Sequence, residues 1–374
     1  MASIAVRNLL YDKIRLTVTL TGIIFAVVLV AVQTGLFLGF TTTTTNVINN
    51  SRADFWVTSR NVDYIEAGVP FPEKEMYHAL AVPGVAEVQK YIVRFGILKK
   101  PDGANANCEI VGFDPERPFG GPWNVVEGDV RSLTLPDTVM IDRFYMKKLG
   151  VTHLGQTVEI RNIRARVVGF TKGIRTFTTS PLIFTSYKNA QKYSALDGNR
   201  TMYLLVKAAP GVDLAGLRTA LQAAMDNVDV LPTREFSRRT NFYWMFGTGA
   251  GLAVIIAAVL GLIVGIVVVA QTIYAATVDH IREFGTLKAM GATNGYIYRI
   301  ILNQAVVSAV AGYAVAIVIA SALEYSSRGG GANIVLPASV RVALFGLTLF
   351  MCVSAALVSI NKVTKIDPAL VFKG

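Results

Sequence analysis

The stretch LTVTLTGIIFAVVLVAVQTGLFLGF, residues 16–40, contains no charged side chain. A helix needs roughly 20 apolar residues to cross the hydrocarbon layer of a bilayer, so this stretch is long enough to span it. It is too long for the apolar region of a secretory signal peptide, and no A-x-A cleavage pattern follows it. We therefore interpret it as a retained membrane span.

Three more segments have the same apolar character, at residues 242–276, 299–324 and 341–361. Buried helices of soluble proteins seldom run so long without a charge, so we predict four membrane helices. The second segment is longer than a bilayer requires. We expect its excess to form a stalk beyond the membrane.

The composition agrees with a membrane protein. The 374 residues are 52% hydrophobic and only 16% charged, with a mean hydropathy of +0.46. These values exclude a disordered chain and are unlike an ordinary soluble enzyme.

The net charge of +11 could indicate a nucleic-acid ligand or a membrane surface. Its distribution favours the membrane. The N-terminal stretch, the segment between spans two and three, and the C-terminal tail together carry nine Lys and Arg, whereas the loop at 325–340 is poor in cations. The positive-inside rule then places both termini in the cytoplasm and the long segment 41–241 outside. The charge divides into +5 inside, +5 in the outer segment and +1 at the outer loop, so we expect no nucleic-acid partner.

The outer segment 41–241 begins and ends with a β-α-β pattern, which predicts a ferredoxin-like split βαβ domain. Its halves cover about 50–98 and 201–235, and an insertion covers about 99–200. The insertion is rich in turns and short strands, so we expect a small β-rich subdomain. The expected strands are 53–59, 86–98, 139–142, 157–162, 165–170, 201–208 and 227–232, and the expected helices are 73–80, 142–150 and 213–225.

No residue pattern in the chain indicates catalysis. The sequence GVTHLGQT at 150–157 comes close to a P-loop but has Gln156 where the phosphate-binding lysine is required. The His and Cys residues have no metal-ligand spacing. Cys108 lies in the outer segment and Cys352 within the fourth span, so we expect no disulfide between them. We predict no catalytic, cofactor-binding or metal site in this chain.

Two pairs of glycines have the G-x-x-x-G spacing that lets helices approach closely: Gly247 with Gly251, and Gly261 with Gly265. Such a pair can serve packing within the chain or a dimer seam, or can reflect the ordinary glycine content of an apolar helix.

The cytoplasmic segment at 277–298 contains DHIREFGTLKAMGATNGY, residues 279–296, with apolar residues at helical spacing and glycines at 285 and 291. This pattern predicts a short amphipathic helix that docks on a partner or lies at the membrane surface, although a simple interfacial loop is an alternative. The N-terminal segment 1–15 is also amphipathic. In the tail, 362–374, Asp367 followed by Pro368 predicts a helix start.

These parts together resemble the FtsX/MacB-type ABC transporter permeases. The specific stretches are REFGTLKAMGA, residues 282–292, and LFMCVSAALVSINKVTKIDPALVF, residues 349–372, which are most similar to DevC-like permeases. The resemblance covers essentially the whole chain, although the outer domain matches in layout more than in motif.

The resemblance implies a homodimer in the bacterial inner membrane, in which each copy binds a separate ABC ATPase subunit that holds ATP and Mg. The outer domain would be the family's porter domain, which meets a periplasmic adaptor (membrane fusion) protein leading to an outer-membrane channel. Membrane lipid would be the other partner, and ATP-driven closure would move the outer domain by mechanotransmission. The residues matching the family's ATPase-coupling helix are Arg282, Glu283, Gly285, Leu287, Lys288 and Gly291.

Two relatives within this resemblance imply other functions. One is a Lol-like permease that releases lipoproteins, and the other is an FtsX-like permease that signals to a cell-wall hydrolase. An outer domain of about 200 residues argues against the second, whose outer domain tends to be smaller. Genes for an adaptor, for lipoprotein factors or for a hydrolase beside this one would separate the three.

Overall fold

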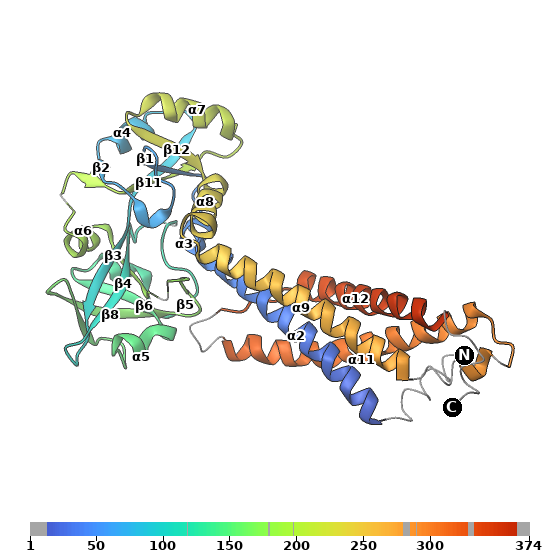
Figure 1. The fold of residues 1–374 in the computed structure, drawn as a ribbon. Helices are drawn as coiled ribbons and strands as arrows, with labels where there is room; N and C mark the ends of the chain where they lie inside the picture. Colours follow the sequence, from blue (N-terminus) through green and yellow to red (C-terminus); the bar gives the residue numbers. More distant parts are fainter. Residues whose placement is uncertain are drawn as a thin grey trace. The chain divides into compact units, whose positions relative to one another are not determined.

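The computed structural model describes residues 13–117, 119–178, 180–196, 198–279, 285–288, 290–327 and 333–364 (Figure 1). The chain divides into two compact units, which we call the helical unit (Met1–Gly39 with Gly251–Gly374) and the α/β unit (Phe40–Ala250). Most of the predicted amphipathic start and C-terminal tail, and the centre of the loop predicted at 325–340, lie outside the described residues.

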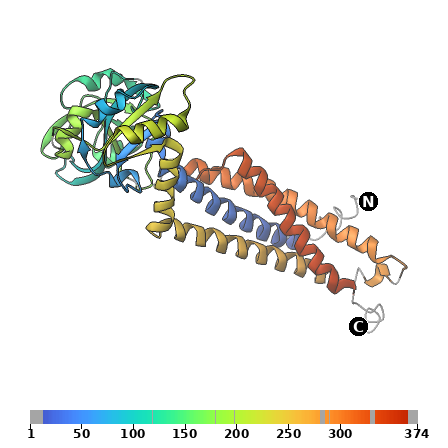
Figure 2. The same cartoon turned by 90° about the horizontal axis from the view of Figure 1, so that it is seen from above.

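Four long helices make up most of the described part of the helical unit (Figure 2). Each contains a stretch that is long and apolar enough to cross a membrane, which confirms the four predicted spans. The helices are α2 (Lys13–Thr43), α9 (Ala250–Asp279), α11 (Asn294–Ser327) and α12 (Ala338–Thr364).

Small side chains allow these helices to pack closely. Ala305 and Ala309 of α11 and Ala356 of α12 are buried in the core of the helical unit. Gly312 of α11 lies so close to α2 that a Cβ atom there would come within 2.6 Å of the Ile23 side chain. Small residues at such contacts are typical of membrane helices, because close backbone approach increases their van der Waals attraction.

The second span differs from its prediction. The sequence predicted a single span with a stalk over 242–276, but the helix α9 begins only at Ala250. Before it, helix α8 (Thr233–Phe242) continues into a π-helical turn (Tyr243–Gly247), and Gly249 then adopts a φ of +74°. A left-handed residue cannot continue a right-handed helix, and glycine adopts this conformation because it lacks a Cβ atom. The charge-free run is therefore two helices joined at Gly249.

The α/β unit contains the predicted split βαβ half. Four strands lie in the order β12-β1-β11-β3, all pairing antiparallel, as two interleaved β-α-β units require. The strands are β1 (Phe55–Ser59), β3 (Val85–Lys99), β11 (Tyr203–Ala208) and β12 (Val228–Pro232), and the crossover helices are α4 (Glu75–Leu80) and α7 (Leu214–Ala224).

Both faces of this sheet are covered. Phe55 and Val57 point to a core shared with α4 and α7, while Trp56, between them, points to the other face. Trp56 is fully buried there, packing edge-to-face on Tyr91 and Tyr203 with ring centroids 5.3 and 5.4 Å apart.

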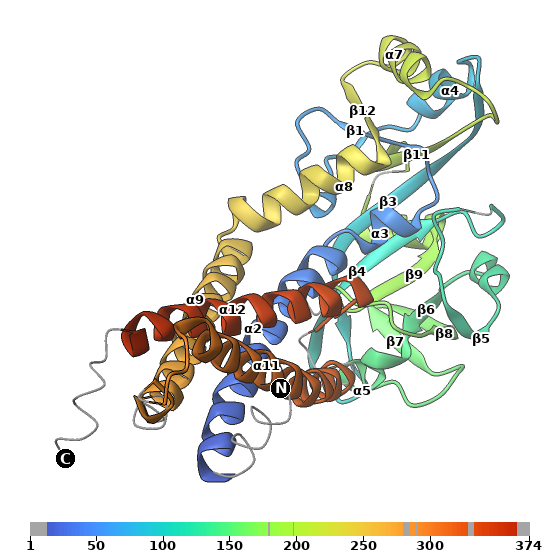
Figure 3. The ribbon, with the colours of Figure 1, turned by 90° about the vertical axis from the view of Figure 1, so that its right-hand side faces the viewer.

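The insertion forms a small closed barrel. Residues 85–91 of β3 pair with β11, whereas residues 92–99 of the same strand pair with β4, so one long strand joins the two halves (Figure 3). The pairings then run β3-β4-β9-β6-β8-β7 and return to β3. The further strands are β4 (Asn105–Phe113), β5 (Val125–Gly128), β6 (Thr138–Asp142), β7 (Thr157–Ile160), β8 (Ile163–Thr171) and β9 (Leu182–Ser186).

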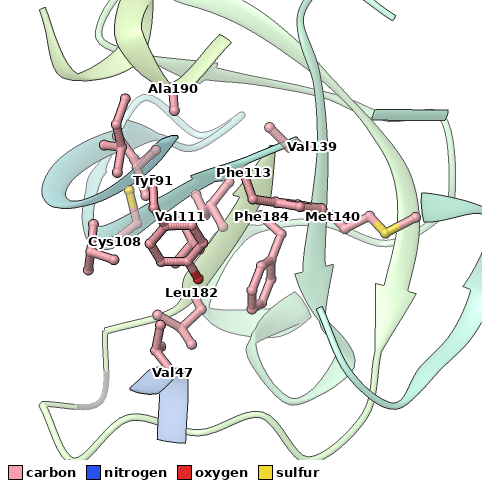
Figure 4. Close-up of a cluster of buried hydrophobic side chains, with 14 of the residues drawn as sticks. Val47, Tyr91, Cys108, Val111, Phe113, Val139, Met140, Leu182, Phe184 and Ala190 are labelled. Atoms are coloured by element: carbon pink, nitrogen blue, oxygen red, sulfur yellow. The ribbon is translucent and has the colours of Figure 1, made fainter. Parts of the chain in front are cut away.

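Apolar side chains fill the barrel and the layer around it. Leu98, Cys108 and Ile160 are fully buried, and Gly96 faces inward, where a Cβ atom would meet the Ile110 side chain at 2.6 Å. Figure 4 shows Cys108 in this cluster beside the large side chains from β4 and β9. The remaining short elements are α3 (Asn46–Asn50), β2 (Phe71–Pro72), α5 (Met146–Leu149), α6 (Tyr187–Ser194), β10 (Arg200–Thr201) and three 3-10 turns, Ile65–Ala67, Val130–Thr134 and Arg143–Tyr145.

The predicted fold class, four membrane helices with a ferredoxin-like α+β domain carrying a β-rich insertion, is thus confirmed. The strands β4, β5 and β9 and the two-residue strands β2 and β10 were missed. In β4, residues 105–110 alternate polar and apolar side chains, so the period-two signal of a strand was present in the sequence and was overlooked.

Candidate coupling site

The segment predicted to couple to an ATPase is only partly described. Arg282 and Glu283 lie outside the described residues, whereas Gly285 to Lys288 are helical and Gly285 is buried. Leu287 is partly buried and packs against the core of the helical unit, a cluster that includes Ile297 and Ile301 of α11, which are 1% and 2% exposed. One side of the segment is therefore anchored to the membrane helices.

A Schellman turn ends the short helix. Gly291 has a φ of +95°, its N–H donates to the Lys288 carbonyl at 3.0 Å, and the Ala292 N–H donates to the Leu287 carbonyl at 3.0 Å. This pair of bonds closes the last helical carbonyls and requires a left-handed residue. No atom lies within 4 Å of the place where a Cβ of Gly291 would stand, so the backbone conformation, and not space, demands glycine.

The chain re-enters a helix directly after this turn. The Thr293 carbonyl accepts the N–H of Tyr296 at 3.0 Å, and α11 begins at Asn294. The result is a compact helix-turn-helix whose inner side is buried and whose tip carries Met290, with 72% of its surface exposed. An exposed methionine on a fixed turn can fill an apolar hollow on another protein.

The two glycine pairs have different surroundings. Gly261 lies against Leu29 and Gln33 of α2, and Gly265 against Val30 of α2 and Met351 of α12. These contacts are within the chain. The break at Gly249 separates Gly247 from Gly251, so that pair does not share one helix face, contrary to the predicted spacing argument.

A third glycine pair was missed by the sequence reasoning. Residues 333–337, which lie between α11 and α12 and which we call the strap, pack on Gly35 and Gly39 of α2. A Cβ at Gly39 would stand 1.7 Å from the Asn333 carbonyl oxygen, and one at Gly35 would stand 2.5 Å from the Ile334 side chain. The Val335 N–H donates to the Gly35 carbonyl at 3.0 Å.

An ion pair holds the base of the strap. Glu324, at the end of α11, meets Arg341 of α12 at 2.8 Å, and its other oxygen accepts the Leu336 N–H at 3.3 Å. Arg341 also donates from Nε to the Leu336 carbonyl at 3.0 Å. In the sequence, Glu324 and Arg341 are single charged residues at the ends of two apolar segments, and this pattern could have predicted their contact.

In the α/β unit, aromatic rings gather where the chain enters and leaves, forming what we call the aromatic junction. Phe40, from the entering segment, packs on Phe177, which packs on Trp244 of the leaving segment at a centroid distance of 4.2 Å. Tyr243 stacks on Tyr64 at 3.8 Å. The two segments are also joined directly by a hydrogen bond from the Thr44 hydroxyl to the Asn241 side chain. Both connections are thus packed into one cluster.

A buried carboxyl group lies in the aromatic junction. The Trp244 indole N–H donates to Glu66 at 3.3 Å, and burial raises the pKa of the Glu66 carboxyl to about 7. Glu109 of β4 is 2% exposed, and burial raises the pKa of its carboxyl well above the ordinary value, with a smaller contribution from Glu66. Neither acid stood out in the sequence.

Within the described ranges, no cluster of three His, Cys, Asp or Glu could hold a metal ion. Cys108 and Cys352 are both buried free thiols in different units. Gln156, in the P-loop-like stretch, uses its side chain to close a turn, donating to the Gly150 carbonyl at 2.8 Å.

Two family models, which together cover most of the chain, match this sequence. Residues 16–224 match the model of the MacB-like periplasmic core domain, and residues 239–368 match that of the FtsX-like permease C-terminal region. An uncharacterized ABC transporter permease of Mycobacterium tuberculosis, Rv0072, is 27% identical over 379 residues, covering 99% of each chain. Another, Mb2592 of Mycobacterium bovis, is 24% identical over 378 residues, again covering 99% of each.

Among solved structures, the periplasmic region of MacB from Actinobacillus actinomycetemcomitans aligns with a TM-score of 0.39 and 14% identity, covering 52% of this chain and 94% of that one. The extracellular domain of the transporter YknZ aligns with a TM-score of 0.35 and 13% identity, covering 47% of this chain and 98% of that domain.

Proposed function

The chain belongs to the family of ABC transporter permeases that combine a MacB-like periplasmic core domain with an FtsX-like permease region, and on that premise we propose that it is the membrane subunit of an exporter driven by a separate ATPase. The ATPase would bind ATP and Mg, and this chain would contribute no catalytic group. The observation that carries the proposal is the turn at Gly291, because it presents an exposed tip on a helix pair anchored in the membrane helices.

In this proposal, the segment 277–298 docks on the ATPase. The buried Gly285 and the partly buried Leu287 hold the helix against the core of the helical unit, and the Schellman turn fixes the backbone that carries Met290. A rigid turn suits this task, since a docking surface that must transmit movement loses less energy to internal bending when its backbone is fixed. Arg282, Glu283 and Lys288 would supply polar contacts beside the apolar tip.

We further propose that movement passes to the α/β unit by mechanotransmission. The aromatic junction supports this, because it packs the entering and leaving segments of that unit on one another through Phe177. A push on either segment would then move both. Two copies of the permease, a periplasmic adaptor and an outer-membrane channel would complete the assembly. The cation distribution supports placing both termini in the cytoplasm of a bacterial inner membrane.

The test is ATPase activity of the permease reconstituted with its ATPase. The change Gly291→Ala forces a side chain into left-handed backbone, at a cost of about 1–2 kcal/mol, and should displace the tip. We expect stimulation of the ATPase to fall at least fivefold, while the protein stays folded and its melting temperature drops by only about 2–8 °C. The matched control is Gly295→Ala, in the first turn of α11, where an added Cβ meets no atom within 4 Å.

A second variant separates docking from folding. Met290→Gln keeps the turn but removes the apolar tip, and it should also lower ATPase stimulation. Full stimulation in both Gly291→Ala and Met290→Gln would show that this segment does not couple to the ATPase.

A further inference from the structure

One exposed surface of the barrel concentrates positive charge. Residues 97–102, 147 and 159–166, at the end of β3, on α5 and along the β7–β8 hairpin, include six cations and only two acids, Asp102 and Glu159. The whole segment 41–243 has a net charge of +5, so most of that excess lies on this small surface. The cations are Lys99, Lys100, Lys147, Arg161, Arg164 and Arg166, and we call this surface the basic rim.

The strand pairings place these residues together. Lys99 of β3 is opposite Glu159 of β7, which in turn is opposite Arg164 of β8, so the three form one row across the strands. The Nζ of Lys99 is 3.7 Å from the Glu159 carboxylate. Arg161 lies at the β7–β8 turn, where its N–H donates to the Ile97 carbonyl at 3.3 Å.

The end of α5 adjoins the same row. A Cβ at Gly150 would stand 3.0 Å from the Pro101 ring and 3.7 Å from the Cβ of Lys100, so the end of α5, the helix that carries the exposed Lys147, adjoins Lys100. A hollow of about 360 Å³ opens between Lys99, Lys100 and Arg164. Its size suits a phosphate-bearing headgroup.

Apolar side chains continue the same outward face. Along β3, Phe95 and Ile97 alternate with the inward-facing Gly96 and Leu98, and they share the outer side with Lys99. They are 46% and 55% exposed. Bulky apolar groups beside Lys and Arg are typical of surfaces that rest at a lipid–water interface.

From this arrangement we propose that the basic rim binds the anionic phosphate headgroups of a lipid bilayer. Cores of protein–protein interfaces are depleted in lysine, whereas three of the six cations of the basic rim, Lys99, Lys100 and Lys147, are lysines. The chain also supplies the bilayer itself, because α2 and α9 anchor both ends of the α/β unit in the membrane and keep lipid within reach.

The test uses the full chain in nanodiscs of phosphatidylcholine, mixed with sucrose-loaded vesicles. One set of vesicles is pure phosphatidylcholine and the other contains 30 mol% phosphatidylglycerol. Sedimentation measures the fraction of nanodiscs captured. We expect preferential capture by the anionic vesicles, and we expect added salt to weaken it.

Variants assign the binding to the basic rim. Arg164→Gln with Arg166→Gln should weaken capture by anionic vesicles about 25-fold, since each cation near such a surface contributes roughly fivefold. Ile97→Thr, which keeps a β-branched residue in the strand, should weaken it further. The matched control is Arg234→Gln with Arg238→Gln, which removes the same charge from exposed positions on α8. Cations on the cytoplasmic segments contribute equally to all variants.

Two results would overturn the proposal. Equal capture of the Arg164/Arg166 variant and its control would show that the basic rim does not bind lipid. The second result has two parts: the unmodified chain shows no preference for anionic vesicles, and it is retained on immobilised polyglutamate while the Arg164/Arg166 variant is not. That result would identify an acidic protein as the partner instead.

Discussion

Gly39→Ala is the change that most directly tests the packing of the strap on α2. An added Cβ would stand 1.7 Å from the Asn333 carbonyl oxygen, which is backbone and cannot rotate away. The strap must therefore lift from α2. Lifting it breaks the hydrogen bond from the Val335 N–H to the Gly35 carbonyl, and it withdraws Leu336, now 2% exposed, from its pocket.

The size of the effect follows from these two contacts. A hydrogen bond of this kind contributes about 1 kcal/mol, and full burial of a leucine side chain contributes about 2 kcal/mol. A partial shift would lose less than the sum, so we expect docking of the strap to weaken by about 2–3 kcal/mol. The undocked population would then rise roughly 30- to 150-fold.

Hydrogen exchange of the purified permease measures this population. The amides of Val335 and Leu336 are both hydrogen-bonded in the docked strap, so their exchange rate reports its opening. We expect exchange in the peptide covering 333–337 to accelerate by the same factor as the undocked population. Gly346→Ala is the matched control, because it adds a methyl group to α12 where no atom lies within 4 Å.

An unchanged exchange rate in Gly39→Ala would refute the reasoning, as would an equal acceleration in Gly346→Ala. In the first case the strap would not rest on Gly39. In the second, any added methyl group in the helical unit would open it.

Two further predictions concern the α/β unit. Trp56→Ala removes a fully buried side chain that packs on Tyr91 and Tyr203. The free energy of unfolding of the α/β unit should fall by about 3–5 kcal/mol. Denaturant titration followed by far-UV circular dichroism measures this loss without relying on tryptophan fluorescence. Glu66→Gln should stabilise the unit by up to about 3 kcal/mol at pH 8 and by little at pH 4.5, as melting curves at the two pH values would reveal. The stabilisation appears at high pH because the pKa of Glu66 is about 7 in the folded protein, above its ordinary value of 4.5. Between these two pH values the unfolded chain loses the proton while the folded protein keeps it, so the free energy of unfolding falls as pH rises. A stability difference that grows toward acid pH would contradict the burial of this carboxyl group.

The sequence alone predicted the four spans because crossing a bilayer is a property of about 20 consecutive residues. Each apolar segment had to satisfy its backbone hydrogen bonds within itself, and only a helix does so. The split βαβ half was also predictable. Strands such as β3 and helices such as α7 have periodic patterns, and their order along the chain leaves few ways to pair them.

The segment proposed to couple to the ATPase was chosen from its pattern, and Gly291 was noted both as helix punctuation and as one of the residues that match the family's coupling helix. The structure supplies its role, because two hydrogen bonds across the turn require a left-handed residue there. The break at Gly249 escaped notice, since a glycine in an apolar run is equally compatible with a continuous helix. Its φ is set by the segments on either side.

What the tertiary structure alone decided is the set of contacts between distant parts of the chain. The closure of the barrel depends on β7 pairing with both β3 and β8, and the strap depends on Gly39 meeting Asn333, almost 300 residues away. The basic rim exists for the same reason, because its cations come from three separate segments, residues 99–100, 147 and 161–166. Local sequence determines which elements form, through hydrogen bonding and apolar periodicity within each segment. Packing of the whole chain determines which elements meet, and in this protein the surfaces proposed to act arise from those meetings.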